Sequence, residues 1–182
     1  MKKTAILFAE GYEEVEALTV VDLLRRAQIG CDIVAIGNPD QTTGSHGITV
    51  RADKAFSETN FEEYDGVILP GGMPGTKNLA ADEKVLKLLQ RFHAAGKLTA
   101  AICAAPTVLA KAGLLEGKNA VCYPGMEAQL TGARAGSAPV AADGTVITSR
   151  GIGTAIPFAL ALVEYFNGAE QAEALAAEIV YR

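Results

Sequence analysis

Residues 98–113, Leu-Thr-Ala-Ala-Ile-Cys-Ala-Ala-Pro-Thr-Val-Leu-Ala-Lys-Ala-Gly, contain the unit that decides the fold. Leu98–Ile102 is a continuous apolar run of strand length, and it leads into a short helix predicted over Pro106–Ala112 and closed by Gly113. A strand that is apolar on both faces is typical of a parallel sheet covered by helices. The stretch therefore predicts one strand-to-helix unit of an α/β protein.

The same alternation extends toward both ends of the chain. Further buried strands are predicted at Ala5–Ala9, Cys31–Ile36, Gly66–Leu69, Ala120–Tyr123 and Val146–Thr148, with a shorter edge or flap strand at Ile48–Arg51. Helices are predicted over Glu13–Gln28, Asp82–His93, Ile156–Phe166 and Ala172–Ile179. Strands that alternate with helices predict a doubly wound parallel sheet in an α/β sandwich, as one domain spanning residues 1–182.

Composition excludes several classes of protein. The chain has 182 residues, 49% of them hydrophobic, and a net charge of −5, which argues against nucleic acid as a partner because phosphates bind clustered positive charge. The first apolar run stops at Glu10, too early for a signal peptide, and no apolar stretch reaches the roughly 18 residues of a membrane span. Three cysteines and two histidines predict neither a disulfide framework nor a metal site. We expect a cytoplasmic protein with reduced thiols and no membrane partner.

Cys103 stands at the junction between the strand and the helix of the opening stretch. Ala101 and Ala105 supply small residues two positions to either side, as a sharp nucleophile elbow requires. Pro106 suits the first turn of a helix, whose positive end favours a thiolate and lowers the pKa of a cysteine. The pattern fits a nucleophile, and it also fits a buried structural cysteine.

A glycine-rich turn, Pro70-Gly71-Gly72-Met73-Pro74-Gly75, follows the strand at Gly66–Leu69. Ligands of such sheets bind beyond the carboxyl ends of the strands, so this turn is expected beside Cys103. The backbone N–H groups of Gly72 and Ala104 are candidates for an oxyanion hole, and Gly71 is a candidate substrate contact. The alternative is a tight turn that binds no ligand. No Gly-Lys-Ser/Thr follows, which excludes a Walker A loop.

Three glutamates fall in the first turns of the first predicted helix. Glu13 and Glu14 are expected to act as dipole partners or solvated charges. Glu16 is followed by apolar positions and is a candidate for an inward-pointing carboxyl whose raised pKa lets it donate a hydrogen bond to a thiolate or act as a general acid and base. The alternative for Glu16 is again a solvated surface charge.

The histidines and one arginine complete the set of candidates. His46, in the loop Gly44–Gly47, either lines the site or ends a turn, whereas His93 is expected to face solvent at a helix end. Arg150 precedes Gly151-Ile152-Gly153, which lacks the third glycine of a dinucleotide fingerprint. We expect Arg150 either to bind an anion or to cap backbone carbonyls.

Taken in order, these segments resemble the ThiJ/PfpI superfamily, and within it the branch of the parkinsonism protein DJ-one and the bacterial YajL-like proteins. The resemblance spans nearly the whole chain and rests on several ordered motifs rather than on one. The motifs are Glu13–Glu16, Val21–Ala27, Val67–Gly72, Ala100–Pro106 and Thr148–Thr154.

The resemblance implies a flavodoxin-like three-layer sandwich with a mostly parallel central sheet, and a homodimer. It also implies that Cys103 is the oxidisable elbow cysteine, that Glu16 is its protonated partner, and that Gly72 and Ala104 supply oxyanion N–H groups. Members of the family are described as glyoxalases that need no added cofactor, as deglycases, and as stress-responsive chaperones.

From this resemblance we expect a cofactor-independent glyoxalase or deglycase that acts on methylglyoxal or glyoxal and on their early adducts with proteins or nucleotides. These activities share a thiolate that adds to a carbonyl while a carboxyl moves protons. The alternative is a non-enzymatic sensor of oxidative stress or a redox-regulated chaperone that uses the same cysteine.

Three positions depart from patterns seen in the superfamily. Tyr123 precedes Pro124 where some members carry a histidine, so a Cys–His dyad is not expected, and the Tyr123 hydroxyl becomes a candidate contact for a substrate oxygen. His46 stands where relatives often have arginine, which suggests a pH-sensitive site or interface. Ala104 replaces the histidine of the protease-like branch and argues against peptidase chemistry.

Overall fold

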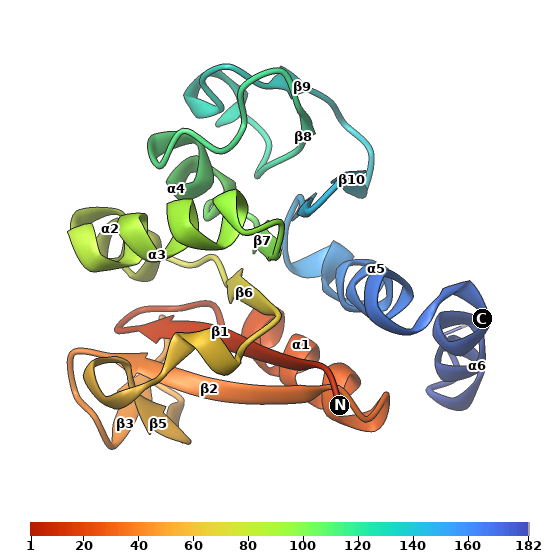
Figure 1. The fold of residues 1–182 in the computed structure, drawn as a ribbon, viewed down its shortest axis with the longest axis horizontal. Coiled ribbons are helices and arrows are strands. Elements are labelled where there is room, and N and C mark those ends of the chain that lie inside the picture. The colour runs from red at the N-terminus through yellow and green to blue at the C-terminus, as the bar shows by residue number, and fades with distance from the viewer. Residues whose placement is uncertain (182) are drawn as a thin grey trace.

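The computed structural model describes residues 1–181, which form one central sheet between two layers of helices (Figure 1). The strand order is β10-β11-β7-β6-β1-β2-β5, and every pairing is parallel except that of β10 with β11. The five inner strands thus follow the 2-1-3-4-5 order of flavodoxin-like folds. The predicted flavodoxin-like sandwich with a mostly parallel sheet is confirmed.

The strands of this sheet are β1 (Lys3–Ala9), β2 (Gly30–Ile36), β5 (Lys54–Ala55), β6 (Gly66–Leu69), β7 (Leu98–Ile102), β10 (Val140–Asp143) and β11 (Val146–Ser149). Two small pairs lie outside it: β3 (Gln41–Thr43) with β4 (Thr49–Arg51), and β8 (Asn119–Ala120) with β9 (Arg134–Ala135). The helices are α1 (Glu14–Arg26), α2 (Gly75–Ala81), α3 (Glu83–Ala94), α4 (Pro106–Lys111), α5 (Ala155–Asn167) and α6 (Ala169–Glu178).

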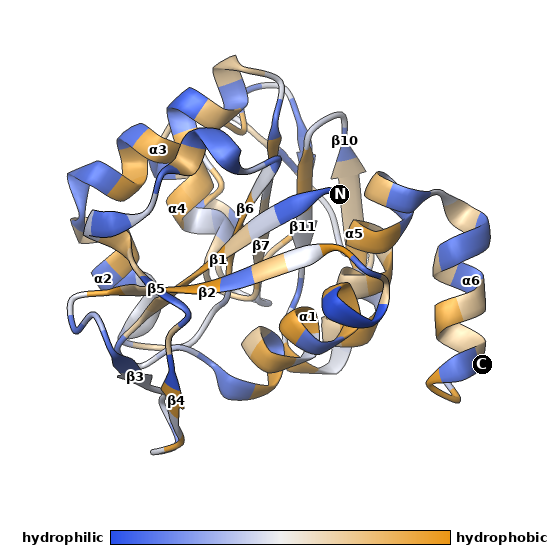
Figure 2. Cartoon of the chain, turned by 60° about the horizontal axis from the view of Figure 1, so that its bottom comes forward, coloured by the Kyte–Doolittle hydropathy of each residue, from blue (hydrophilic) through white to orange (hydrophobic). Residues whose placement is uncertain are grey.

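Two hydrophobic clusters cover the two faces of the sheet. Residues of α3 and α4 pack on one face, and those of α1, α5 and α6 pack on the other. Figure 2 shows α3 alternating between hydrophobic and hydrophilic residues along its length. Its apolar stripe, Val85, Leu88, Leu89 and Phe92, is buried as the sequence predicts.

The structure differs from the sequence expectations in several elements. Of the strand expected at Ala120–Tyr123 only Ala120 is in a strand, β8, which pairs with β9 outside the central sheet, and the N–H of Tyr123 donates to the carbonyl of Cys103 instead. The sequence does not predict helix α2 or strands β3, β5, β9 and β10, since none of them has a long apolar period. The flap strand expected at Ile48–Arg51 is β4, which pairs with β3 in a hairpin beside α1.

The topology fixes the place of the site. Strand order reverses between β1 and β6, and in open α/β sheets this switch point opens a crevice at the carboxyl edge. The segments after β1, β6 and β7 all leave the sheet at that edge, and they carry Glu16, Gly71 and Cys103 respectively. Among residues 1–181, no helix is long and apolar enough to cross a bilayer.

Candidate active site

Cys103 follows β7 in a left-handed backbone conformation, with φ of 65°. For a residue other than glycine this conformation costs about 1–3 kcal/mol, so the surrounding structure must hold it. Two backbone hydrogen bonds do so: the N–H of Cys103 donates to the carbonyl of Ser149 at 3.0 Å, and the carbonyl of Cys103 accepts from Tyr123 at 2.8 Å. The thiol is half-buried at the crevice, which is the placement expected of an elbow nucleophile.

Glu16 approaches the thiol from α1. Its side chain is 1% exposed, it shares a hydrogen bond with the thiol of Cys103, and its Oε2 accepts from the N–H of Gly71 at 2.9 Å. A Cβ atom at Gly71 would lie 2.6 Å from both Glu16 Oε2 and the Cβ of Cys103. Gly71 is therefore the spacer that lets carboxyl and thiol meet, and its N–H serves Glu16.

Burial raises the pKa of both members of this pair. The pKa of Glu16 rises to about 7, mainly through burial, although its hydrogen bonds with Cys103 and Gly71 oppose the rise. The pKa of Cys103 rises to about 12 through burial and through the charge of Glu16. The expected lowering of the thiol pKa is wrong for the resting site, because burial and the carboxylate outweigh the backbone dipoles. A proton transferred from Cys103 to Glu16 would remove that opposing charge.

The backbone N–H groups of Gly72 and Ala104 both point at the Cys103 sulfur, and both lower its pKa. Donors in these positions stabilise negative charge that develops at or beside the sulfur. The structure thus brings together the four residues that the sequence singled out for chemistry: Cys103, Glu16, Gly72 and Ala104.

Tyr123 and Arg150 lie on segments that adjoin Cys103. Tyr123 is 52% exposed and is tied to Cys103 through its backbone N–H. Arg150 directly follows Ser149, whose carbonyl accepts the N–H of Cys103. The Nη1 of Arg150 donates to the carbonyl of Ser137 at 3.3 Å. Arg150 therefore caps a carbonyl, the second of its two expected roles.

A cluster of Glu13, Glu14, Ser45 and His46 borders the site. Glu14 is 3% exposed, so the expectation of a solvated charge is wrong for it: its Oε1 accepts from the His46 backbone N–H at 2.7 Å, and its Oε2 lies 2.9 Å from His46 Nδ1. The donor atoms of Glu13, Glu14 and His46 fall within 4.8 Å of one another, the spacing of a metal-ligand group. In this structure they bind one another. The sequence contains no signal for this contact, since the partners are some 30 positions apart.

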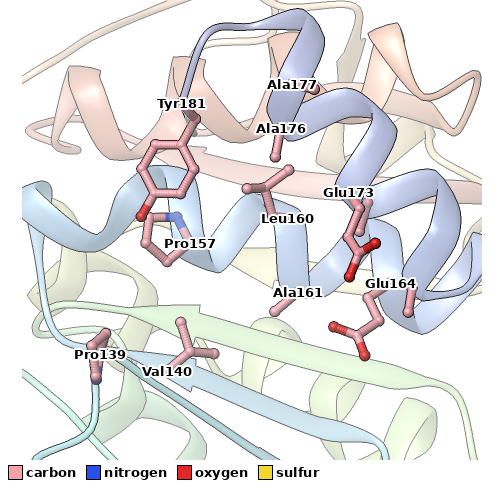
Figure 3. Close-up of a pocket in the computed structure, with 12 residues that line it drawn as sticks. Pro139, Val140, Pro157, Leu160, Ala161, Glu164, Glu173, Ala176, Ala177 and Tyr181 are labelled. Carbon is pink, nitrogen blue, oxygen red and sulfur yellow. The ribbon is translucent and has the colours of Figure 1, made fainter.

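The remaining features lie away from Cys103. His93, at the end of α3 beside the buried Phe92, is partly buried rather than fully facing solvent. Figure 3 shows a groove between α5, α6 and the start of β10, with Leu160 and Val140 among its apolar lining and Glu164 and Glu173 at one end. None of the candidate site residues lines this groove.

Comparison with known proteins decides the family. The family model described as the DJ-1/PfpI family matches residues 2–165. The chain belongs to the DJ-1/PfpI family. This confirms the resemblance on which the sequence expectations rest.

Curated relatives agree over most of the chain. It is 36% identical to protein dj-1beta of Drosophila melanogaster over 96% of the chain and 95% of the relative. It is 33% identical to a deglycase of Pyrococcus abyssi over 81% of the chain and 89% of the relative. It is 38% identical to protein DJ-1 homolog B of Arabidopsis thaliana over 90% of the chain, which spans only 37% of that longer protein.

Solved structures share the fold. The structure of Drosophila DJ-1beta matches with a TM-score of 0.94 at 36% identity, over 99% of this chain and 98% of that one. The structure of oxidised Toxoplasma gondii DJ-1 matches with a TM-score of 0.95 at 36% identity, over 99% of this chain and 98% of that one.

Proposed function

We propose that this protein is a cofactor-independent deglycase or glyoxalase that acts on methylglyoxal or glyoxal and on their early adducts with proteins or nucleotides. The observation that carries the proposal is the buried contact between the Glu16 carboxyl and the Cys103 thiol, with the N–H groups of Gly72 and Ala104 at the sulfur. The deglycase named among the relatives supports the same chemistry.

The first step is addition to an aldehyde. The Cys103 thiol passes its proton to Glu16, the sulfur bonds to the aldehyde carbon, and the carbonyl π electrons move to oxygen. The N–H groups of Gly72 and Ala104 stabilise that oxygen, which takes the proton back from Glu16 to give a hemithioacetal.

The second step moves hydrogen between the two carbons of the substrate. Glu16 takes the proton from the former aldehyde carbon, which leaves an enediol, and returns it to the neighbouring carbon. The hydroxyl proton on the former aldehyde oxygen passes to the neighbouring oxygen, so the hemithioacetal becomes a 2-hydroxy thioester. Water then cleaves the thioester, which frees Cys103 and releases lactate from methylglyoxal or glycolate from glyoxal. In an early adduct the former aldehyde carbon already carries the amine as a hemiaminal. The thiol replaces the amine at that carbon and the amine leaves with the thiol proton, so the resulting hemithioacetal follows the same course.

Four candidates take no part in the bond changes of this proposal. Tyr123 offers its hydroxyl to a substrate oxygen, His46 and Arg150 shape the rim, and buried Gly71 holds Glu16 through its N–H. Val15 in α1 and Ile48 in the turn of the β3–β4 hairpin are apolar and are 49% and 52% exposed. We propose that they belong to a homodimer interface, which sedimentation equilibrium tests. A cytoplasmic location stays a prediction.

The experiment that tests the proposed function measures hydroxy-acid formation by the purified protein in the presence of a chelator. We expect Cys103→Ser to lower the rate of lactate formation by more than about 10³-fold. The control variant Cys31→Ala should keep the rate, because Cys31 lies in β2 away from the site. Recovery of the free guanidinium group of a methylglyoxal-modified arginine derivative, at a rate above its spontaneous release, separates deglycase from glyoxalase activity.

Two results would overturn the proposal: no hydroxy acid above the uncatalysed rate, or full activity in Cys103→Ser. In that case the second candidate, a redox sensor or redox-regulated chaperone, gains support from the oxidised state of the T. gondii relative. Its signature is binding of unfolded client protein that depends on sulfinic acid at Cys103 and proceeds without carbonyl turnover.

A further inference from the structure

His46 is joined to the N-terminal turn of α1 by both its backbone and its ring. The backbone N–H donates to Glu14 Oε1 at 2.7 Å, and Nδ1 lies 2.9 Å from Glu14 Oε2 and 3.5 Å from Glu13 Oε2. The Ser45 hydroxyl donates weakly to both carboxylates, at 3.4 Å. The tip of the β3–β4 hairpin is therefore fastened to the first residues of α1.

The same turn of α1 carries the acid of the candidate active site. The backbone N–H of Glu13 donates to the carbonyl of Gly71 at 2.9 Å, and the N–H of Gly71 donates to Glu16 at 2.9 Å. Gly71 is thus held from both sides by residues of this one turn. A displacement of Glu13 or Glu14 would also displace Glu16 relative to Cys103.

The charges of the cluster depend on His46. Two carboxylates, Glu13 and Glu14, are the charged groups that face the ring among the described residues, and they raise the pKa of His46. In return, the His46 hydrogen bonds help to lower the pKa of Glu14 to about 2 although burial opposes this. With a protonated ring the three side chains carry a net charge of −1, and with a neutral ring −2. That extra negative charge lies beside Glu16.

We propose that His46 is a positioning residue whose protonated ring holds the first turn of α1 where Glu16 meets Cys103, so that the reactivity of Cys103 falls when the ring loses its proton. The proposal rests on the Cys103–Glu16 pair of the proposed function and adds a regulator to it. The effect is partial, because the backbone hydrogen bond of His46 and the Ser45 hydroxyl remain when the ring is neutral.

The test compares alkylation of Cys103 by iodoacetamide in wild type, His46→Arg and His46→Gln between pH 5.5 and 8.5, with a chelator present. Arginine keeps the positive charge at all these pH values, and glutamine never carries it. Peptide mass spectrometry isolates the Cys103 adduct from those of Cys31 and Cys122. Rates are expressed as ratios to His46→Arg at the same pH, so that the titration of Cys103 itself cancels to first order. His93→Gln is the matched control, since it removes the other histidine of the chain.

We expect the wild-type ratio to be near one at low pH and to fall about two- to fivefold as the pH rises through the pKa of His46, the size of a single exposed ion pair. His46→Gln should stay at the lower level throughout, and His93→Gln should follow wild type. Ring NMR signals, assigned to His46 by their loss in His46→Gln, should titrate at the same midpoint. A merely structural role would not be restored by arginine, and it would not produce a midpoint.

Two outcomes overturn the proposal: a wild-type ratio that does not change with pH, or His46→Gln equal to His46→Arg at every pH. Neither outcome depends on carbonyl turnover, so this proposal can fail while the proposed function stands. Conversely, the turnover assay on Cys103→Ser tests the proposed function and does not bear on the role of His46.

Discussion

Cys31 and Cys103 lie at opposite edges of one parallel sheet and have the same raised pKa of about 12. Burial is the main cause at both. Cys31 is 2% exposed in the second position of β2, and the hydroxyl of Thr4 is its side-chain partner. Cys103 lies beyond the end of β7, with a left-handed backbone and a carboxyl against its thiol. The thiol pKa therefore does not distinguish the two cysteines. Cys103 differs from Cys31 in having a carboxyl, that of Glu16, placed to accept its proton.

The largest expected effect comes from the proton acceptor. Glu16→Gln should lower carbonyl turnover by about 10³-fold, because the amide cannot shuttle a proton. The same change should lower the pKa of Cys103, since the ionised Glu16 raises it. Turnover assays and the pH dependence of alkylation measure the two effects separately. Asp32→Asn, next to Cys31, is the control that should leave turnover unchanged. Unchanged turnover in Glu16→Gln would remove the distinction between the two cysteines.

The next largest effect on turnover concerns a glycine near each cysteine: Gly71 contacts Cys103 in the fold, and Gly30 precedes Cys31 in the sequence. An added Cβ at Gly71 would lie 2.6 Å from atoms of Cys103 and Glu16. At Gly30 the closest atom to an added Cβ is the Cγ of the flexible Lys3 side chain, at 3.3 Å. Gly71→Ala should lower turnover by about 10²-fold through misplaced groups, and Gly30→Ala should retain it. Steady-state kinetics of both variants measure this. Equal activities would show that the close approach at Gly71 is not needed.

Oxidation gives a smaller contrast. At limiting hydrogen peroxide, Cys103 should be converted to sulfinic acid at least about tenfold faster than Cys31, because it is accessible and has Glu16 to take its proton. Peptide mass spectrometry over a peroxide titration measures both. Cys122, which is buried, serves as an internal reference. Equal oxidation of all three cysteines would contradict a special environment at Cys103.

The smallest effect is on acid stability at the α1 end of the site. Glu14 has its pKa lowered from 4.5 to about 2, so its contribution is complete above about pH 4.5 and is lost as the pH falls toward 2. Glu14→Gln should cost about 1 kcal/mol of unfolding free energy at pH 6, and the difference from wild type should shrink below pH 4. Urea unfolding at several pH values measures it. Glu83→Gln, on an exposed carboxylate, should show no such trend.

The fold could be predicted from the sequence because it leaves local signals, whereas the pairing of Cys103 with Glu16 follows only from the family resemblance. Apolar strands mark the sheet, and Cys103 and the Gly71–Gly72 turn stand at strand ends, where parallel topology brings them together. The direction of the Cys103 pKa could not be predicted, because it depends on how deeply the thiol is buried and on the charge of Glu16. The burial of Glu14 was missed for a related reason: its partner, His46, lies on a hairpin whose position against α1 is set by tertiary packing.

The two backbone hydrogen bonds that hold Cys103 have a consequence for the chain while it is being synthesised. Its N–H needs the carbonyl of Ser149 and its carbonyl needs the N–H of Tyr123, both of which are synthesised later than the cysteine. On the ribosome, the thiol therefore exists before the backbone conformation that places it, as an ordinary flexible cysteine. That conformation becomes available only when β11 joins β7 and the last strand of the parallel sheet is in place. Under the proposed function, a nascent or truncated chain that ends before β11 should show no carbonyl turnover at Cys103, although its thiol can still be alkylated.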